Sequence, residues 1–421
     1  MAHIFTEDLC KGVSFSYINS NKFKTAEISL SFFMPLSKQF ASAFSLLISV
    51  LSDSCNKFKN FRDLNKKTED LYGACIDYNI SKKGNYHILD LYVCSIDDRF
   101  TMNNEDNINK MSEILCDLVF DPLIKNNSFD ESVVSLKKLE ISELIDSRMT
   151  DKRVWSMIQC KKAMFKNEQS GIDTLGEKSD INSISSSYLY EIYQKILRES
   201  RVKIMMSASS EYSTVLERFK SRFSEINRDY FEFEKCNFIR PSEVKYIDEK
   251  LDVQQCKLVM GFRSPFIKPD DTHVLSLSAA IFGGLPTSRL FMSVREKMNL
   301  CYYCSSRFDS FNGSLFVESG VEKANAEKAK NEILNQLKIM SESLVTDDEI
   351  NDAKNYLSQY ATSISDSIGG LHNWYLSQYS CGLSESPEEF AEKISKISKE
   401  NIRDCMSNVL LDTVYMLKGD E

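Results

Sequence analysis

The segment "FGGLPTSRLFMSVREKMNLCYYCSS", residues 282–306, predicts a helix that ends near Arg295 and a strand that begins near Tyr302. The strand pair "CSSRFDSFNGSLFVESGV" then turns at Gly313. The same order occurs earlier in the chain, where the amphipathic "FRDLNKKTEDLYG" precedes "YNISKKGNYHILDLYVC" and its turn at Gly84. The segment therefore belongs to one of two copies of an internal repeat.

The repeat extends over the whole chain. Each half opens with alternating apolar residues, "GVSFSYINSNKFKTAEISLSFFMP" and "EVKYIDEKLDVQQCKLVMGFRSPF", which predict a β-hairpin. An apolar helix follows in each half, "FASAFSLLISVLSDS" and "THVLSLSAAIFGG", and each half ends with a helix and an apolar strand. The order β-β-α-α-β-β-α-α-α-β is used twice.

This order predicts an α+β fold with two homologous domains, each a mainly antiparallel sheet covered by helices. Residues 1–227 are the predicted N-terminal domain and residues 243–421 the C-terminal domain. The polar and aromatic residues 228–242 form the predicted linker.

Bulk composition narrows the class of protein. The chain has 421 residues, 42% hydrophobic and 27% charged, as is typical of a soluble globular protein. A net charge of −9 argues against nucleic acid and anionic membranes as partners. The start "MAHIFTEDLCKG" shows no signal-peptide pattern, and no apolar run reaches the roughly 20 residues of a membrane helix, so we expect a cytoplasmic protein.

The twelve cysteines are scattered through mostly apolar runs, which predicts buried, reduced thiols. Cys301 and Cys304 have the CxxC spacing. Because alternate residues of a strand point to opposite faces, we expect these two thiols to face apart. This argues against a redox pair or a zinc knuckle.

The duplicated order resembles the M16 metalloprotease family of insulinase, pitrilysin and mitochondrial processing peptidase. "LYGACIDYNISKKGNYH" and "FGGLPTSRLFMSVREKMNLCYYCSS" are the stretches most similar to it. Within that family the chain looks most like bacterial peptidase-like members of about this length that lack the HxxEH motif. The resemblance implies an M16 metallopeptidase-like fold.

Active members carry HxxEH on the apolar helix of the first half, where two histidines bind zinc and the glutamate acts as general base. Placed on "SLLISVLSDSC", the resemblance puts Ser45 and Ser49 at the histidines and Ile48 at the base. The chain's four histidines, His3, His87, His273 and His372, are too far apart in sequence to share one helical face. Glu143 falls roughly at the family's third ligand, beside Glu140, and we interpret it as a solvated helical residue. The chain itself is thus expected to bind no metal.

The second half retains the family's other motif. An Arg and a Tyr seven residues apart contact the substrate carbonyl and the tetrahedral intermediate in the family, and Arg295 and Tyr302 match them. Taken by spacing alone, Arg295 would pair with a surface acid near Glu296 and Tyr302 would pack at a sheet edge. With the wider motif included, we favour substrate binding by both residues.

The resemblance implies a non-metal-binding, peptidase-like subunit that is catalytically incomplete alone. Its expected partner is an HxxEH-bearing homologue in a heterodimer, which would supply zinc, and its expected substrate is a peptide. The alternative is a non-enzymatic structural or assembly protein that retains the fold. A homodimer stays open, and a serine hydrolase is disfavoured because no GxSxG elbow surrounds Ser45 or Ser49.

Overall fold

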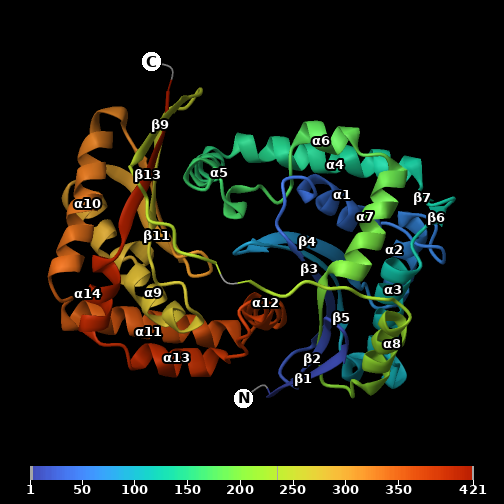
Figure 1. Ribbon diagram of the computed structural model, residues 1–421. Helices are drawn as coiled ribbons and strands as arrows, with labels where there is room; N and C mark the ends of the chain where they lie inside the picture. Colours follow the sequence, from blue (N-terminus) through green and yellow to red (C-terminus); the bar gives the residue numbers. More distant parts are fainter. Residues whose placement is uncertain (1–2, 235, 420–421) are drawn as a thin grey trace. The chain divides into compact units, whose positions relative to one another are not determined.

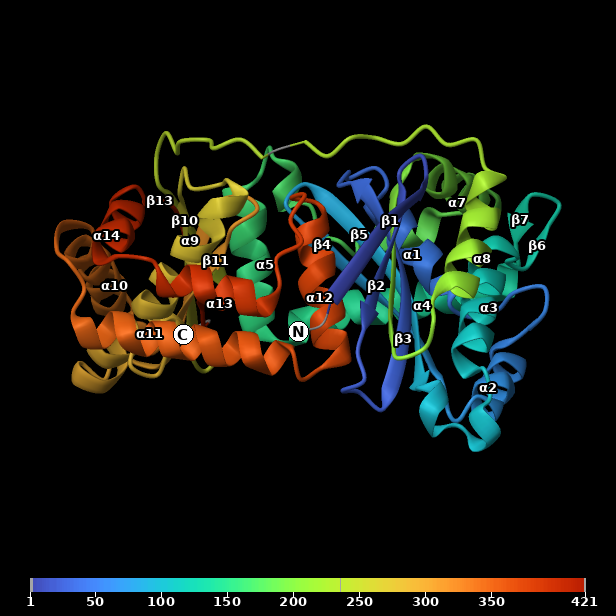
Figure 2. The same ribbon diagram turned by 90° about the horizontal axis from the view of Figure 1, so that it is seen from below.

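The computed structural model describes residues 3–234 and 236–419. The chain divides into two compact units, each assembled from three segments. Unit 1 comprises the described residues of Met1–Asp146, Ile172–Glu234 and Ser365–Ser380. Unit 2 comprises the described residues of Ser147–Gly171, Lys235–Ile364 and Cys381–Glu421. Figure 1 shows the secondary structure along the chain, and Figure 2 shows it from a second direction.

Unit 1 contains a six-stranded sheet of order β1-β2-β8-β3-β5-β4. Its strands are β1 His3–Cys10, β2 Val13–Asn19, β3 Thr25–Pro35, β4 Cys75–Lys83, β5 Tyr86–Ile96 and β8 Arg201–Ala208. Every neighbouring pair is antiparallel except β2 and β8, which are parallel. The prediction of a mainly antiparallel sheet is therefore confirmed for this half.

Helices cover one face of this sheet. They are α1 Ala41–Leu51, α2 Phe61–Asp70, α3 Asn107–Phe120, α4 Glu131–Thr150, α6 Lys178–Ser183, α7 Ser186–Glu199 and α8 Ser213–Ser224. A two-stranded ribbon, β6 Ile124–Lys125 with β7 Ser128–Phe129, precedes α4. Alternate residues of β3 point toward these helices into the core: Ala26, Ile28, Leu30 and Phe32. These four side chains are almost completely buried and belong to the hydrophobic core that stabilises this half.

Unit 2 contains a five-stranded sheet of order β11-β12-β10-β13-β9. Its strands are β9 Lys245–Lys250, β10 Cys256–Arg263, β11 Cys301–Asp309, β12 Ser314–Val321 and β13 Leu410–Lys418. Its helices are α5 Lys152–Met164, α9 Thr272–Ala279, α10 Ala326–Glu342, α11 Asp347–Ile364, α13 Pro387–Ser395 and α14 Lys399–Ser407, with π-helical turns at Ala280–Gly284 and Phe291–Lys297. No helix in the described ranges is long and apolar enough to cross a membrane.

The predicted hairpins at the start of each half are wrong. The last strand of each half inserts between the two strands that were expected to pair: β8 separates β2 from β3, and β13 separates β9 from β10. The physical reason is burial. Residues 202–208 of β8 and 412–417 of β13 are buried without interruption, so these strands need a partner on each side and a cover on each face.

The two halves of the sequence exchange one helix each. Helix α5 follows α4 in sequence but packs on β10 and β13, where Cys160 and Met164 join the cluster around Tyr415. Helix α12, Ile368–Tyr379, follows α11 in sequence but packs on β3 and β8. Since β3 and β8 correspond to β10 and β13, the two helices occupy equivalent places in the repeat. The predicted division at residues 228–242 follows sequence order and stays a prediction.

The two exchanged helices dock by different chemistry. Arg263 of β10, almost fully buried, donates to Asp412 at 2.7 Å and to Glu168, just after α5, at 3.0 Å. In unit 1 the face of β3 beneath α12 is polar, and His372 of α12 lies 3.1 Å from the Glu27 carboxylate. Apolar packing and a buried ion pair therefore hold α5, whereas α12 combines a polar contact with aromatic packing of Tyr379 on Phe33 of β3.

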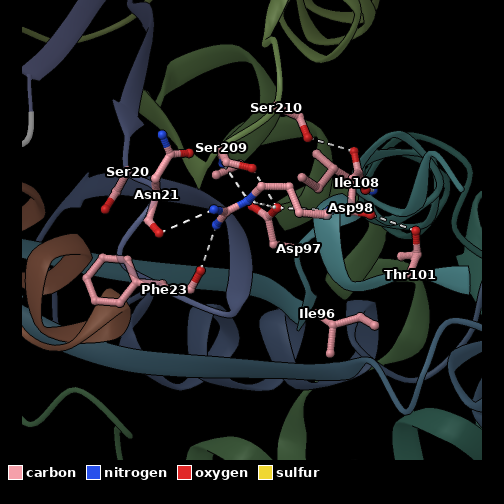
Figure 3. Close-up of polar contacts among 12 residues, drawn as sticks. Ser20, Asn21, Phe23, Ile96, Asp97, Asp98, Thr101, Ile108, Ser209 and Ser210 are labelled. Atoms are coloured by element: carbon pink, nitrogen blue, oxygen red, sulfur yellow. Dashed lines mark hydrogen bonds and ion pairs between the residues drawn. The ribbon is translucent and has the colours of Figure 1, made fainter. Parts of the chain in front are cut away.

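Asp97 organises the corner where the loop after β2, the end of β5 and the end of β8 meet (Figure 3). Its buried carboxylate accepts hydrogen bonds from the Ser209 backbone at 2.8 Å, the Ser209 hydroxyl at 2.6 Å and Arg99 Nε at 2.9 Å. Arg99 also donates to the backbone carbonyl of Phe23. Burial opposes ionisation of Asp97, but the hydrogen bonds from Ser209 and Arg99 outweigh it and hold the pKa below its usual value.

Replacing Asp97 by alanine should lower the free energy of unfolding by about 2–4 kcal/mol, because it leaves buried donors unpaired. The depressed pKa means that this stabilisation is complete above the unfolded-state value, about 3.9, and is lost as pH falls through the folded-state pKa. Urea unfolding at pH 7 and at about pH 3 measures both effects. The matched control is Asp70→Ala at the exposed end of α2. An Asp97→Ala protein as stable as that control would refute the assignment.

Candidate active-site half

Arg295 lies on the surface of the π-helical turn Phe291–Lys297. Its guanidinium stacks over the Phe291 ring at 4.5 Å, and its Nε lies 3.5 Å from the Glu296 carboxylate. The expected pairing of Arg295 with a nearby acidic side chain is therefore present, but both side chains are about half exposed. Such a pair contributes at most about 1 kcal/mol, so it leaves the cation available to another anion or carbonyl.

Tyr302 projects from a β-bulge in β11, an edge strand of the unit 2 sheet. The register with β12 passes from Cys301–Val321 directly to Tyr303–Gly320, so Tyr302 has no partner residue. Its side chain is 70% exposed, and no hydrogen bond to its hydroxyl occurs within the described residues. The alternative that Tyr302 packs at the sheet edge is therefore wrong.

A tight junction sets the spacing of these two residues. The backbone of Asn299 has φ 50°, the left-handed conformation that ends helices, and its N–H donates to the Arg295 carbonyl at 3.0 Å. Leu300 follows, buried, with its N–H donating to the carbonyl of Val294. The buried Leu300 and Val294 anchor the junction, so both functional candidates are carried on ordered backbone.

The predicted zinc-motif positions are buried on α1. Ser45, Ile48 and Ser49 are at most 1% exposed. The Ser45 hydroxyl donates to the Leu175 carbonyl at 3.0 Å. At Gly176, where φ is +75°, an added Cβ would lie 2.0 Å from the Ser42 hydroxyl, so the segment around Leu175 seals the helix.

This arrangement does not fit a zinc centre. Two serines and an isoleucine offer no zinc ligand of the usual kind, and a catalytic zinc also needs an open position for water. Glu143 is exposed on α4, in agreement with its interpretation as a solvated residue, and Glu140 pairs with Lys137 at 2.9 Å. The described part of the chain holds no group of three or more His, Cys, Asp or Glu side chains that could bind a metal ion.

Cys301 and Cys304 correct the prediction that they face apart. Cys301 lies opposite Val321 and Cys304 opposite Ser319, two residues apart on β12, so the bulge returns both thiols to one face. Both are buried. The prediction from strand alternation is wrong here because Tyr302 is an extra residue in β11 with no counterpart in β12, which forms the bulge.

Ser45→Ala and Ser49→Ala should change stability differently, although both replace a buried serine of α1. The Ser45 hydroxyl has two carbonyl acceptors, whereas the Ser49 hydroxyl is buried without a hydrogen-bond partner within the described residues. Both variants gain equally in helix propensity. We therefore expect Ser49→Ala to be more stable than Ser45→Ala by about 1–3 kcal/mol, measured by urea unfolding. Equal stabilities would show that the Leu175 contact does not seal the helix.

Residues 183–357 match the family described as the peptidase M16 inactive domain. Over 97% of its length the chain is 28% identical to "Probable inactive metalloprotease YmfF" of Bacillus subtilis, of which it covers 96%. A crystal structure of a conserved protein from Enterococcus faecalis superposes with a TM-score of 0.90 at 24% identity, covering 99% of each chain. A peptidase M16 inactive domain from Pseudomonas fluorescens gives a TM-score of 0.78 at 15% identity, covering 99% of this chain and 98% of the other.

Proposed function

We propose that this M16-like chain, which lacks the zinc-binding motif, is the substrate-binding subunit of a heterodimeric zinc peptidase. Its partner would be a homologue that carries HxxEH. This chain would supply Arg295 and Tyr302 to peptide hydrolysis at the partner's metal. The observation that carries the proposal is the position of Tyr302, a largely exposed phenol that follows a hydrogen-bonded junction anchored by the buried Val294 and Leu300.

The exposure of both residues supports a role outside the fold. A tyrosine that served packing alone would bury its ring, because each buried aromatic contributes substantially to stability. Tyr302 instead presents the ring and hydroxyl to solvent, and the contacts of Arg295 with Phe291 and Glu296 lie at the surface.

The chemistry suits these two groups. Zinc in the partner would supply the activated water and polarise the scissile carbonyl. A guanidinium and a phenolic hydroxyl can each donate a hydrogen bond to the oxygen on which charge develops in the tetrahedral intermediate. Such donors act without metal ligands of their own, so a chain with Ser45, Ile48 and Ser49 in place of HxxEH can still contribute half of a site.

The test measures peptide hydrolysis with zinc by this chain, by its HxxEH homologue and by their mixture. We expect cleavage by the mixture only. Arg295→Ala and Tyr302→Phe should each lower kcat/KM of the mixture roughly a hundredfold, the usual cost of losing one oxyanion donor. Complex formation, measured by size-exclusion chromatography with light scattering, should be unchanged in both variants.

The controls are neighbours on the same strand. Arg307→Ala removes an exposed arginine of β11, and Tyr303→Phe removes the hydroxyl of a ring that contacts Arg153 at 4.6 Å. Both should leave the mixture's activity intact. Cleavage by this chain alone would overturn the assignment of the metal to a partner. Absence of any complex or cleavage would favour the non-enzymatic structural protein instead.

A cytoplasmic location forms part of the proposal. It is supported by the cysteines, because no disulfide is formed within residues 3–234 and 236–419, as is usual in a reducing compartment. Light scattering of the isolated chain also decides whether it forms a homodimer before it meets its partner.

A further inference from the structure

The cysteine pair beside Tyr302 has a geometry that the proposed function does not use. The β-bulge places Cys301 and Cys304 opposite residues two apart on β12. Two strand residues span about 6.6 Å, which lies at the upper end of the Cα separations that a disulfide bridges. Val321 and Ser319 share one face of β12, so the side chains of Cys301 and Cys304 lie on the same face of the sheet. A modest tightening of the bulge would therefore join them.

The two thiols differ in acidity. The hydrogen bond from Cys304 lowers the pKa of Cys301 most, Ser319 and the Arg295 charge lower it further, and burial opposes them. The same hydrogen bond, together with burial, raises the pKa of Cys304 well above its usual value. One sulfur is thus the better nucleophile as thiolate, while the other retains its proton.

A second pair of cysteines provides a comparison within the same chain. Cys75 of β4 lies directly opposite Cys94 of β5, and Cys75 is exposed. Burial and then Asp77 raise the pKa of Cys75, while burial and then Glu27 raise that of Cys94 to about 11. This pair is therefore close and more accessible, but neither sulfur is activated.

We propose that Cys301 and Cys304 form a redox-active dithiol that a hydroperoxide converts to an intramolecular disulfide. The Cys301 thiolate attacks the terminal oxygen of the hydroperoxide, an S–O bond forms, the O–O bond breaks, and the departing alkoxide, or hydroxide in the case of hydrogen peroxide, is protonated to the alcohol or to water. Cys304 then loses its proton and its sulfur attacks the Cys301 sulfenic acid. The S–S bond forms, the S–O bond breaks, and water leaves. The peroxide is reduced by two electrons and the dithiol is oxidised by two.

The bridge would constrain the backbone on both sides of Tyr302. Its formation does not depend on the proposed function, because it concerns only the thiols of this chain. Only an effect of the bridge on peptide hydrolysis would rest on that function. The test below measures thiols alone, so the two proposals can fail separately.

The experiment treats the reduced full-length chain with hydrogen peroxide, blocks remaining thiols with N-ethylmaleimide and maps tryptic peptides by mass spectrometry. Cys301 and Cys304 lie on one tryptic peptide, residues 298–307, whereas Cys75 and Cys94 lie on two, residues 68–82 and 84–99. The first bridge therefore appears as the loss of two hydrogens from a single unalkylated peptide. The second appears as a cross-linked pair of peptides.

We expect the Cys301–Cys304 bridge to form about tenfold faster than the Cys75–Cys94 bridge, because thiolate character governs the first step. Dithiothreitol should reverse it. Cys304→Ser should stop at a sulfenic acid on Cys301 that dimedone traps, and Cys301→Ser should give no bridge. Faster oxidation of Cys75–Cys94, or a Cys304→Ser protein without sulfenic acid, would overturn the proposal.

A pH series with iodoacetamide supplies a second measurement on the unmodified chain. Alkylation of Cys301 should reach half its maximal rate at a lower pH than alkylation of Cys75. The reverse order would contradict the assignment of Cys301 as the attacking sulfur, whether or not the serine variants fold.

Discussion

Each sheet depends on the last strand of its own repeat. β8 lies between β2 and β3, and β13 lies between β9 and β10. Each of these strands makes one parallel and one antiparallel ladder, and its side chains are buried on both faces. Without it, β1 and β2 of unit 1, or β9 of unit 2, have no link to the rest of their sheet. The hydrophobic core of each unit is therefore closed by contacts between residues far apart in sequence, a topology associated with slow folding.

The sequence predicted the elements better than their pairing. Strand alternation, glycine turns and the repeat identify the class and the order of elements, and Gly84 and Gly313 do take the positive φ angles that their turns require. Strand order could not be predicted because alternation records which face is buried and not which strand lies alongside. The exchange of α5 and α12 was likewise not predicted, since the sequence of a helix does not indicate the sheet on which the helix packs. The uninterrupted apolar run of β8 was the available signal for a central strand.

The residues of the candidate site were predicted from the sequence, but their structural surroundings were not. Arg295 and Tyr302 follow from a spacing and a motif, and the structure adds their exposure and the Asn299 turn that connects them. The cysteine pair was misjudged because one unmatched residue reverses the facing of everything beyond it. Only the register with β12 reveals that shift. The sealing of α1 also arises from a distant segment, although Gly176 in "DTLGEK" hinted at a turn there.

The exchange of α5 and α12 has a consequence for the origin of such a chain and for its dissociation after cleavage. A single repeat that lends its helix to an identical copy is a domain-swapped homodimer, and joining the two copies end to end yields the connectivity seen here. The duplication would then have preserved the domain-swapped interface of the homodimer within one polypeptide. By the same logic, cleavage of the connecting segment would leave two fragments, each with a helix packed on the sheet of the other. These fragments could separate only by unfolding.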